Sequence, residues 1–253
     1  MTEPRLYLDQ PLSSGTPVAL DRDAAHYLGN VLRLGSGDSV KLFNGRDGEW
    51  RASIGRLAKS GGDAVPRELL RPQVAEPDLW LLFAPVKGHR TESIAEKAGE
   101  LGVSEIRPVL TRRTVMRRVN VARLQANARE AAEQCERLTL PLVQEPVTLE
   151  QAIADWPADR RLLYADERAG ARPAAEALAS CQPGGKWAVL VGPEGGFAPE
   201  EQVLVRALPQ ALPVSLGPRL LRADTAAFAT LALWQAHLGD WRGGDAGWPH
   251  AAS

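Results

Sequence analysis

The 253-residue sequence has few of the residues that build metal centres and disulfide frameworks. It contains two cysteines, Cys135 and Cys181, without the CxxC spacing of many zinc sites, and its four histidines are scattered along the chain. Clustered thiols and imidazoles are what such sites require. We therefore expect neither a disulfide scaffold nor a bound metal.

The sequence also lacks long apolar runs and an excess of charge of one sign. No stretch approaches 18 consecutive apolar residues, and the amino-terminal MTEPRLYLDQ has no basic region followed by an apolar one. The 30 Lys and Arg almost balance the 31 Asp and Glu, which gives a formal net charge of −1. We expect a cytoplasmic protein that does not bind membranes, and any nucleic-acid partner must be met by a local basic patch.

The amino-terminal part of the chain is patterned as short strands separated by turns. Residues 5–71 contain the strand candidates RLYLD, TPVAL, SVKLFN and EWRASIGRL, with one helix candidate, DAAHYLGNVLRL. Closely spaced strands of this kind predict a small barrel or sandwich. A proline-containing linker, RPQVAEPD, follows, so we predict one domain over residues 1–74 and a second over residues 75–253.

After Asp78 the pattern changes to alternating strands and helices. Strands are predicted at LWLLFAPV, EIRPVL, RRLLYA, KWAVLV and PVSL, which indicates βαβ units and a mostly parallel sheet. The last predicted helix, about Thr225 to Leu238, has no Asp, Glu, Lys or Arg. Such a helix is normally buried, either in the core or against a second subunit. The Gly-rich tail after it is expected to be loose.

A glycine-containing turn, VGPEGGF over residues 191–197, joins one of these strands to a helix. Its spacing fits neither the GxxxxGK[ST] of a Walker loop nor the GxGxxG of a dinucleotide-binding fold. Glu194 at its centre would also repel a pyrophosphate. The turn therefore suits a cationic or neutral ligand better than a polyphosphate.

A second string, SLGPRLLRADTAA over residues 215–227, also follows a strand and precedes a helix. Gly217 and Pro218 force a bend there, and Asp224 or Thr225 is expected to cap the helix. Loops at the ends of parallel strands converge at the carboxyl edge of a sheet, where α/β proteins bind ligands. The two loops could therefore grip one ligand through backbone N–H and C=O groups.

Together, VGPEGGF and SLGPRLLRADTA resemble the signature of the SPOUT methyltransferases, and specifically the bacterial family that methylates N3 of a uridine in 16S ribosomal RNA. The upstream strings HYLGNVLRLGSGD, EKAGELGVSEIRPV and EAAEQCERLTLP resemble that family in order and spacing. The resemblance covers most of residues 5–236. The chain departs from the residues usual in the family at Ala198, Leu220 and Asp224. The family usually has Glu where Asp224 stands, so the change puts in doubt only a role that needs the longer side chain.

The resemblance implies an α/β fold: a trefoil-knotted SPOUT methyltransferase domain with an N-terminal PUA-like β-barrel domain that helps to hold RNA. It also implies a homodimer that acts on 16S ribosomal RNA or the small ribosomal subunit and binds S-adenosylmethionine. The implied cofactor contacts, largely through backbone groups, are Ala165, Asp166, Gly192, Pro193, Glu194, Gly195, Leu216, Gly217, Leu221 and Ala226. The alternative is that the two strings are simple tight turns. Glu194 would face the positive charge of the cofactor or cap the next helix.

A run of arginines is the one strong local bias of charge. Residues 107–129 contain seven arginines and no acidic residue, which predicts a phosphate-binding patch, although charged runs are usually solvated surface. With the family in view, the RNA-binding candidates are Arg33, Arg112, Arg113, Arg117, Arg118, Arg129 and Arg137.

The implied reaction requires that N3 of the uridine lose its proton. Either a carboxylate takes the proton or a fixed cation stabilises the negative charge on the flanking carbonyl oxygens. Arg222 suits the second route, unless it only forms an ion pair with Asp224, and Glu133 or Glu194 could serve as the base. Two other functions stay open: a related knotted enzyme with another RNA target or base position, and a catalytically silent RNA-binding module.

Overall fold

The computed structural model describes residues 3–166 and 170–242 and forms two compact units. One unit comprises residues 1–75 and 132–140, and the other comprises residues 76–131 and 141–253. The Gly-rich tail expected to be loose lies outside the described residues from position 243 onward. The short segment 132–140 therefore belongs structurally to the amino-terminal unit, although it lies far from it in sequence.

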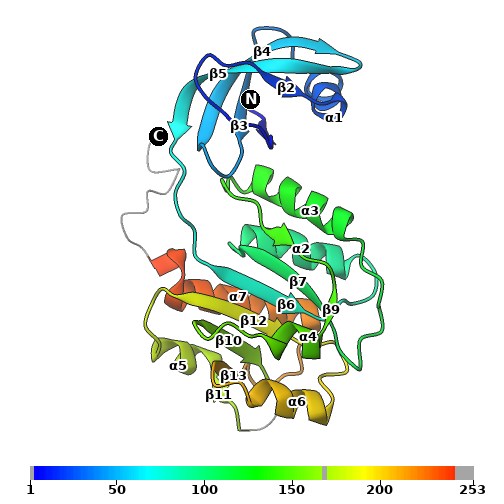
Figure 1. Cartoon of the computed structure of the whole chain (residues 1–253), viewed down its shortest axis with the longest axis vertical. Coiled ribbons are helices and arrows are strands. Elements are labelled where there is room, and N and C mark those ends of the chain that lie inside the picture. Colours follow the sequence, from blue (N-terminus) through cyan, green and yellow to red (C-terminus); the bar gives the residue numbers. More distant parts are fainter. Residues whose placement is uncertain (1–2, 167–169, 243–253) are drawn as a thin grey trace. The chain divides into compact units, whose positions relative to one another are not determined.

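The first unit is built on one curved five-stranded sheet, whose long strands dominate its ribbon in Figure 1. The strand order is β1-β3-β4-β5-β2, with β1 and β3 parallel and the other pairs antiparallel. The strands are β1 (Arg5–Tyr7), β2 (Val18–Leu20), β3 (Ser39–Phe43), β4 (Glu49–Ala58) and β5 (Gly61–Arg71). The predicted helix of this unit forms as α1 (Arg22–His26), which continues into a π-helical turn, η1 (Tyr27–Val31).

The core of this unit comes from alternate residues of the strands and from the helix. Leu28, Val40 and Leu42 are fully buried, and Ile54 is 2% exposed. Because side chains alternate across a strand, the intervening residues of β3 and β4 are free to face away from this core. Asp21 caps α1 by accepting a hydrogen bond from the backbone N–H of Ala24.

A buried ion-pair network fastens segment 132–140 to the sheet of this unit. Arg5 lies beside Glu49 in an ion pair that is almost completely buried, and its Nη1 donates to the carbonyl of Ala132 at 2.7 Å. Arg71 also pairs with Glu49 and donates to the carbonyl of Glu136 at 2.8 Å. Burial alone would raise the pKa of Glu49, but hydrogen bonds from Arg71 and Arg5 outweigh it and hold that pKa below its ordinary value.

The second unit contains an eight-stranded parallel sheet, as the alternation of strands and helices predicted. The order is β11-β13-β10-β12-β6-β7-β8, and β9 pairs with β7. The strands are β6 (Leu79–Phe83), β7 (Glu105–Leu110), β8 (Leu142–Val143), β9 (Val147–Thr148), β10 (Arg160–Ala165), β11 (Arg172–Pro173), β12 (Lys186–Val191) and β13 (Ala211–Ser215).

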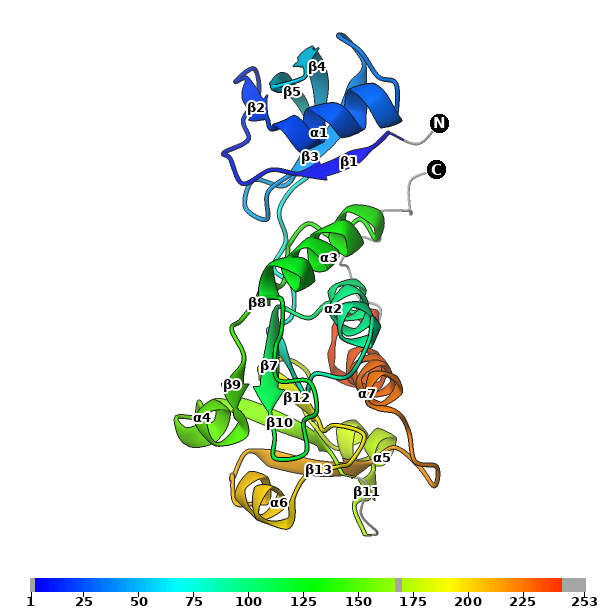
Figure 2. The ribbon, with the colours of Figure 1, turned by 90° about the vertical axis from the view of Figure 1, so that its right-hand side faces the viewer.

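Helices cover both faces of this sheet, as Figure 2 shows. One face packs against α2, α5 and α7, and the other against α4 and α6. The helices are α2 (Arg90–Glu100), α3 (Val121–Gln134), α4 (Leu149–Ala154), α5 (Ala174–Ala179), α6 (Pro199–Arg206) and α7 (Ala223–Leu238), followed by the 3₁₀ turn η2 (Asp240–Arg242). The strands between them are apolar on both sides because both sides are covered.

The uncharged helix predicted near the carboxyl terminus is α7. Ala227, Leu231 and Trp234 are buried in the core, and the rings of Trp234 and Trp187 meet edge to face with centroids 6.4 Å apart. The predicted cap was wrong. The helix begins at Ala223 with Arg222 in the N-cap position and no side-chain cap, and the carboxylate of Asp224 accepts a hydrogen bond from the neighbouring N–H of Thr225.

Two strands that follow each other in the chain lie on opposite sides of β13. Strand β10 lies between β12 and β13, whereas β11 pairs with the outer edge of β13. Strands β10 and β11, which follow each other in the chain, are therefore separated in the sheet by β13, a later strand. Strands that are consecutive in the chain usually lie side by side. This strand order agrees with the knotted topology that the family resemblance implies.

Candidate functional site

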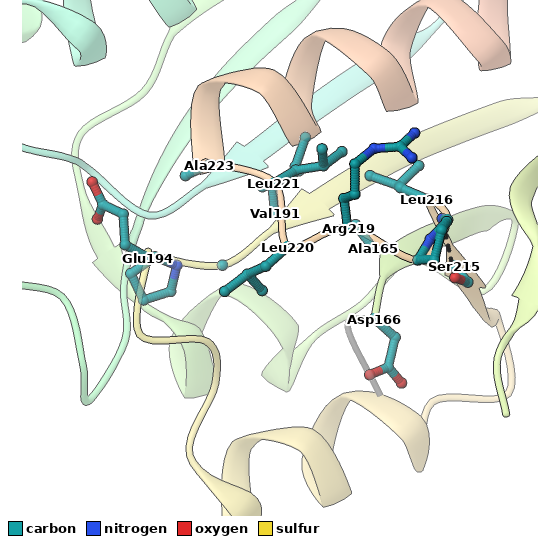
Figure 3. Close-up of a pocket in the computed structure, with 15 residues that line it drawn as sticks. Ala165, Asp166, Val191, Glu194, Ser215, Leu216, Arg219, Leu220, Leu221 and Ala223 are labelled. Atoms are coloured by element: carbon teal, nitrogen blue, oxygen red, sulfur yellow. Dashed lines mark hydrogen bonds between the residues drawn. The ribbon is translucent and has the colours of Figure 1, made fainter. Parts of the chain in front are cut away.

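A cavity of about 250 Å³ lies at the carboxyl ends of β10, β12 and β13. Three strand-end loops and the first turns of α7 form it, as Figure 3 shows. Its lining residues are Ala165, Asp166, Val191, Gly192, Pro193, Glu194, Ser215, Leu216, Gly217, Pro218, Arg219, Leu220, Leu221, Ala223 and Ala226. This is the edge of a parallel sheet where α/β proteins hold ligands.

The cavity presents backbone donors between apolar walls. Within the described part of the chain, the backbone N–H groups of Gly192, Leu216 and Leu221 donate to no protein acceptor. Gly192, Leu216 and Leu221 are partly exposed at the hollow, so their backbone amides are accessible to a ligand with acceptor atoms. Val191 and Ala226 supply buried apolar surface beside these donors.

The structure brings the predicted cofactor residues together, because all of them except Gly195 line this cavity. Gly195 lies in the same loop, and its carbonyl accepts a hydrogen bond from Nη1 of Arg113 at 2.7 Å. The sequence reasoning left out several lining residues that flank the predicted ones: Val191, Ser215, Pro218, Arg219, Leu220 and Ala223. Their position next to the ends of β12 and β13 was the signal that could have found them.

Asp166 contributes to the cavity without offering a free carboxylate. Its side chain is 1% exposed and forms an ion pair with Arg206 of α6. In Figure 3 the carboxylate points toward that helix and away from Leu216 and Leu221. The backbone of Asp166 is held as well, because its N–H donates to the carbonyl of Val214 at 2.9 Å.

Glu194 does not cap the helix that follows it. Its carboxylate pairs with Nη1 of Arg90 at 2.9 Å, and the cap of α6 comes instead from Glu201, which accepts from the N–H of Ala198 at 2.8 Å. The capping alternative is therefore wrong. Glu194 remains partly exposed at the cavity with its charge balanced by Arg90.

The loop that carries Glu194 is fixed at its base by close packing. A Cβ added to Gly192 would lie 2.6 Å from Cε2 of Phe197, so only glycine fits at that position. Phe197 is 2% exposed and packs edge to face against Tyr164, with ring centroids 5.4 Å apart. The sequence motif thus specifies the loop through a steric requirement as well as through a turn.

Two arginines of the second loop lie differently with respect to the cavity. Arg219 lines it, whereas Arg222 is exposed at the N-cap of α7 and is not among the lining residues. The ion pair considered between Arg222 and Asp224 is absent from the described residues. Arg222 is therefore a cation close to the cavity, with no carboxylate partner among residues 3–166 and 170–242.

The arginine-rich segment is partly neutralised by carboxylates from elsewhere in its unit. Arg107 pairs with Glu105, Arg112 with Glu200 and Arg123 with Glu92. Among the described residues, no carboxylate pairs with the exposed Arg117 and Arg118, and Arg129 is exposed on α3. The patch available to an anion is smaller than the count of arginines suggested.

Two predicted residues belong to the first unit. Arg137 is 9% exposed, so its side chain is not presented to a partner in this structure. The carboxylate of Glu133 accepts a hydrogen bond from the backbone N–H of Tyr7 at 3.0 Å. Glu133 is not among the residues that line the cavity. Both residues help to hold segment 132–140 in place.

The first unit has a hollow of its own beside α1 and η1. It is lined by Arg22, Ala25, His26, Gly29, Asn30, Leu34, Gly35, Ser36, Gly55, Arg56, Leu57, Ala58 and Lys59. No Asp or Glu is among these described lining residues, so the hollow carries positive charge. Arg33, a predicted RNA contact, is exposed in the following turn with a φ of 58°.

The described ranges 3–166 and 170–242 contain no group of three or more His, Cys, Asp or Glu side chains placed to hold a metal ion. Within the same ranges, none of the helices combines the length and the apolar character that crossing a membrane requires.

Comparison with known proteins places the chain in a family. Residues 74–235 match the RNA methyltransferase domain, and residues 20–65 match the RNA methyltransferase PUA domain. Ribosomal RNA small subunit methyltransferase E of Rickettsia conorii is 32% identical over 90% of this chain and 93% of its own, and that of Synechocystis is 35% identical over 85% and 71%. The solved structure of ribosomal RNA small subunit methyltransferase E from Neisseria gonorrhoeae, bound to S-adenosylmethionine, is 30% identical and has a TM-score of 0.83 over 95% of this chain and 100% of that one. The chain therefore belongs to the RNA methyltransferase family, with a PUA domain at its amino-terminal end.

Proposed function

We propose that this protein transfers a methyl group from S-adenosylmethionine to N3 of a uridine in the 16S ribosomal RNA of the small ribosomal subunit. The observation that carries the proposal is the cavity between the loops of residues 192–194 and 215–221, with its unpaired backbone donors. The names of the relatives and the cofactor in the Neisseria structure support it. The choice of uridine N3 comes from the family resemblance.

The cavity residues fit S-adenosylmethionine by their chemistry. The N–H groups of Gly192, Leu216 and Leu221 can donate to ring nitrogens or hydroxyls, and the apolar walls suit an aromatic base. The carboxylate of Glu194 also lines the cavity, and Arg90 already balances its charge. When bound, the cofactor supplies an electrophilic methyl group on a sulfonium.

Arg222 is the residue that we propose to assist the loss of the uridine proton. A guanidinium stays charged at neutral pH, so it cannot act as a base, but it stabilises negative charge that develops on a carbonyl oxygen. Arg222 carries no ion pair within the described residues and is positioned by the N-cap of α7. Glu194, which lines the cavity and is already paired with Arg90, remains the alternative base.

RNA binding in this proposal uses basic surface on each unit. On the second unit, Arg117 and Arg118 are exposed cations without carboxylate partners in the described structure. On the first unit, Arg22, Arg56 and Lys59 surround a hollow free of lining carboxylates. Arginine suits both tasks because it binds phosphate through two hydrogen bonds and stacks on unpaired bases. We also propose that the protein acts as a homodimer, as the family resemblance implies.

The test is analysis of nucleosides from 16S ribosomal RNA by mass spectrometry. RNA from a strain that lacks the gene should lack one 3-methyluridine, and the wild-type gene should restore it. A matched strain that expresses Arg222→Ala should restore it poorly. Persistence of 3-methyluridine, or loss of a different methylated nucleoside, would refute the assigned position, and binding of RNA without any lost methylation would leave only an RNA-binding module.

A further inference from the structure

The tip of the loop at residues 193–196 lies beside the cavity, with Glu194 and Gly195 exposed and Pro193 and Gly196 buried. The N–H of Gly196 donates to the carbonyl of Pro193 at 2.8 Å, which closes a turn. Beyond this, two arginines from other elements hold the tip: Arg90 pairs with Glu194, and Arg113 donates to the carbonyl of Gly195. The conformation of the tip therefore depends on side chains outside the loop.

Hydrogen bonds to buried side chains hold the backbone that carries Arg113, although the Arg113 side chain lies at the surface. Thr111 and Thr114 are 3% and 5% exposed and hydrogen-bond to each other, with the N–H of Thr111 donating to Oγ1 of Thr114 at 2.8 Å. The N–H of Arg112 donates to Oε1 of Glu201 at 2.7 Å. Glu201 is 1% exposed, so this anchor lies in the interior.

The same buried carboxylate also holds the carboxyl-terminal end of the loop of residues 192–198, which we call the cofactor loop. Oε2 of Glu201 accepts from the N–H of Ala198, while Oε1 accepts from Arg112. Glu201 thus joins the start of the arginine-rich segment to the end of the loop, and Arg113 joins the same segment to the loop tip. Two independent contacts link these parts of the chain.

From this arrangement we infer that Arg113 is a positioning residue for the cofactor loop. Its hydrogen bond to the carbonyl of Gly195 keeps the loop in the conformation that lines the cavity, so its primary effect is on cofactor affinity. The sequence alone predicted an RNA contact at this position. The inference rests on the proposed function, because it assumes that the cavity binds S-adenosylmethionine.

The test compares binding of S-adenosylmethionine, by calorimetry, to the full-length wild type, Arg113→Ala and Arg113→Lys. Arg113→Ala should raise the Kd for S-adenosylmethionine about tenfold. A change of this size corresponds to the low end of what a hydrogen bond from a charged group contributes. Arg113→Lys keeps a charged donor and should recover part of that loss. The thermal midpoint without cofactor should change by less than about 2 °C, because the substituted side chain is at the surface.

Arg117→Ala is the matched control, since it removes a charge from the same segment without touching the loop. It should weaken binding of 16S ribosomal RNA transcribed in vitro and leave the Kd for S-adenosylmethionine unchanged. A wild-type Kd for the cofactor in Arg113→Ala, with weakened RNA binding only, would overturn the inference and make Arg113 an RNA contact. Absence of cofactor binding by the wild type would instead refute the proposed function.

Discussion

Replacing Gly192 with alanine tests the steric logic of the cofactor loop. The added Cβ would lie 2.6, 2.9 and 3.1 Å from three carbons of the Phe197 ring, whereas relaxed carbon contacts are about 3.5–4.0 Å. The ring cannot move freely, because it is buried against Tyr164. The overlap of about 1 Å should therefore displace the loop, at the cost of about 1–3 kcal/mol that is usual for overpacking.

We expect Gly192→Ala to lower the thermal midpoint by about 5 °C, which follows from that cost for a domain of this size. The Kd for S-adenosylmethionine, measured by calorimetry, should rise by about tenfold or more because a backbone donor leaves its place. Gly35→Ala, in the first unit, is the control for adding a methyl group to a glycine, since its Cβ would meet nothing within 4 Å. Wild-type stability and affinity in Gly192→Ala would refute the reasoning.

Three further predictions concern other parts of the molecule. Arg222→Ala should preserve cofactor affinity and cut methyl transfer, measured with radiolabelled cofactor, about 100-fold, and unchanged turnover would remove Arg222 from the chemistry. The double variant of Arg117 and Arg118 to alanine should weaken RNA binding and reduce its salt dependence, in a filter-binding titration against salt concentration, and an unaltered slope would exclude both as phosphate contacts. The pKa of Glu49 is lower in the folded protein than in the unfolded chain, where it is near 4.5. Its carboxylate therefore stabilises the fold at pH values above 4.5, and this stabilisation is lost as the pH falls through the pKa of the folded state. In Glu49→Gln, the urea midpoint of unfolding should therefore fall less steeply at acid pH than in the wild type. An identical fall in the two proteins would contradict the role of the Arg5 ion pair.

The sequence predicted the parallel sheet because its strands are apolar on both faces and alternate with helices, a pattern that few other architectures share. It also predicted the two turns that line the cavity, since glycine and proline after a buried strand restrict the backbone in ways that can be recognised locally. Gly192 is the clearest case: the motif required glycine, and the structure supplies the reason in the ring of Phe197.

The contacts that depend on distant partners could not be predicted. Nothing near Glu194 in the sequence indicates Arg90 as its partner, and nothing near Arg113 indicates the carbonyl of Gly195. The membership of segment 132–140 in the first unit is of the same kind, because it depends on Arg5 from the beginning of the chain. The number of arginines in the sequence therefore overestimated how many lack a carboxylate partner in the described structure.

The central claim is that the cavity between the strand-end loops binds S-adenosylmethionine, and a crystal structure of the protein grown with that cofactor tests it most directly. The expected result is density for the cofactor against Gly192, Leu216 and Leu221, within hydrogen-bonding distance of their backbone N–H groups. Density for the cofactor elsewhere on the chain, with this cavity filled only by water, would contradict the claim.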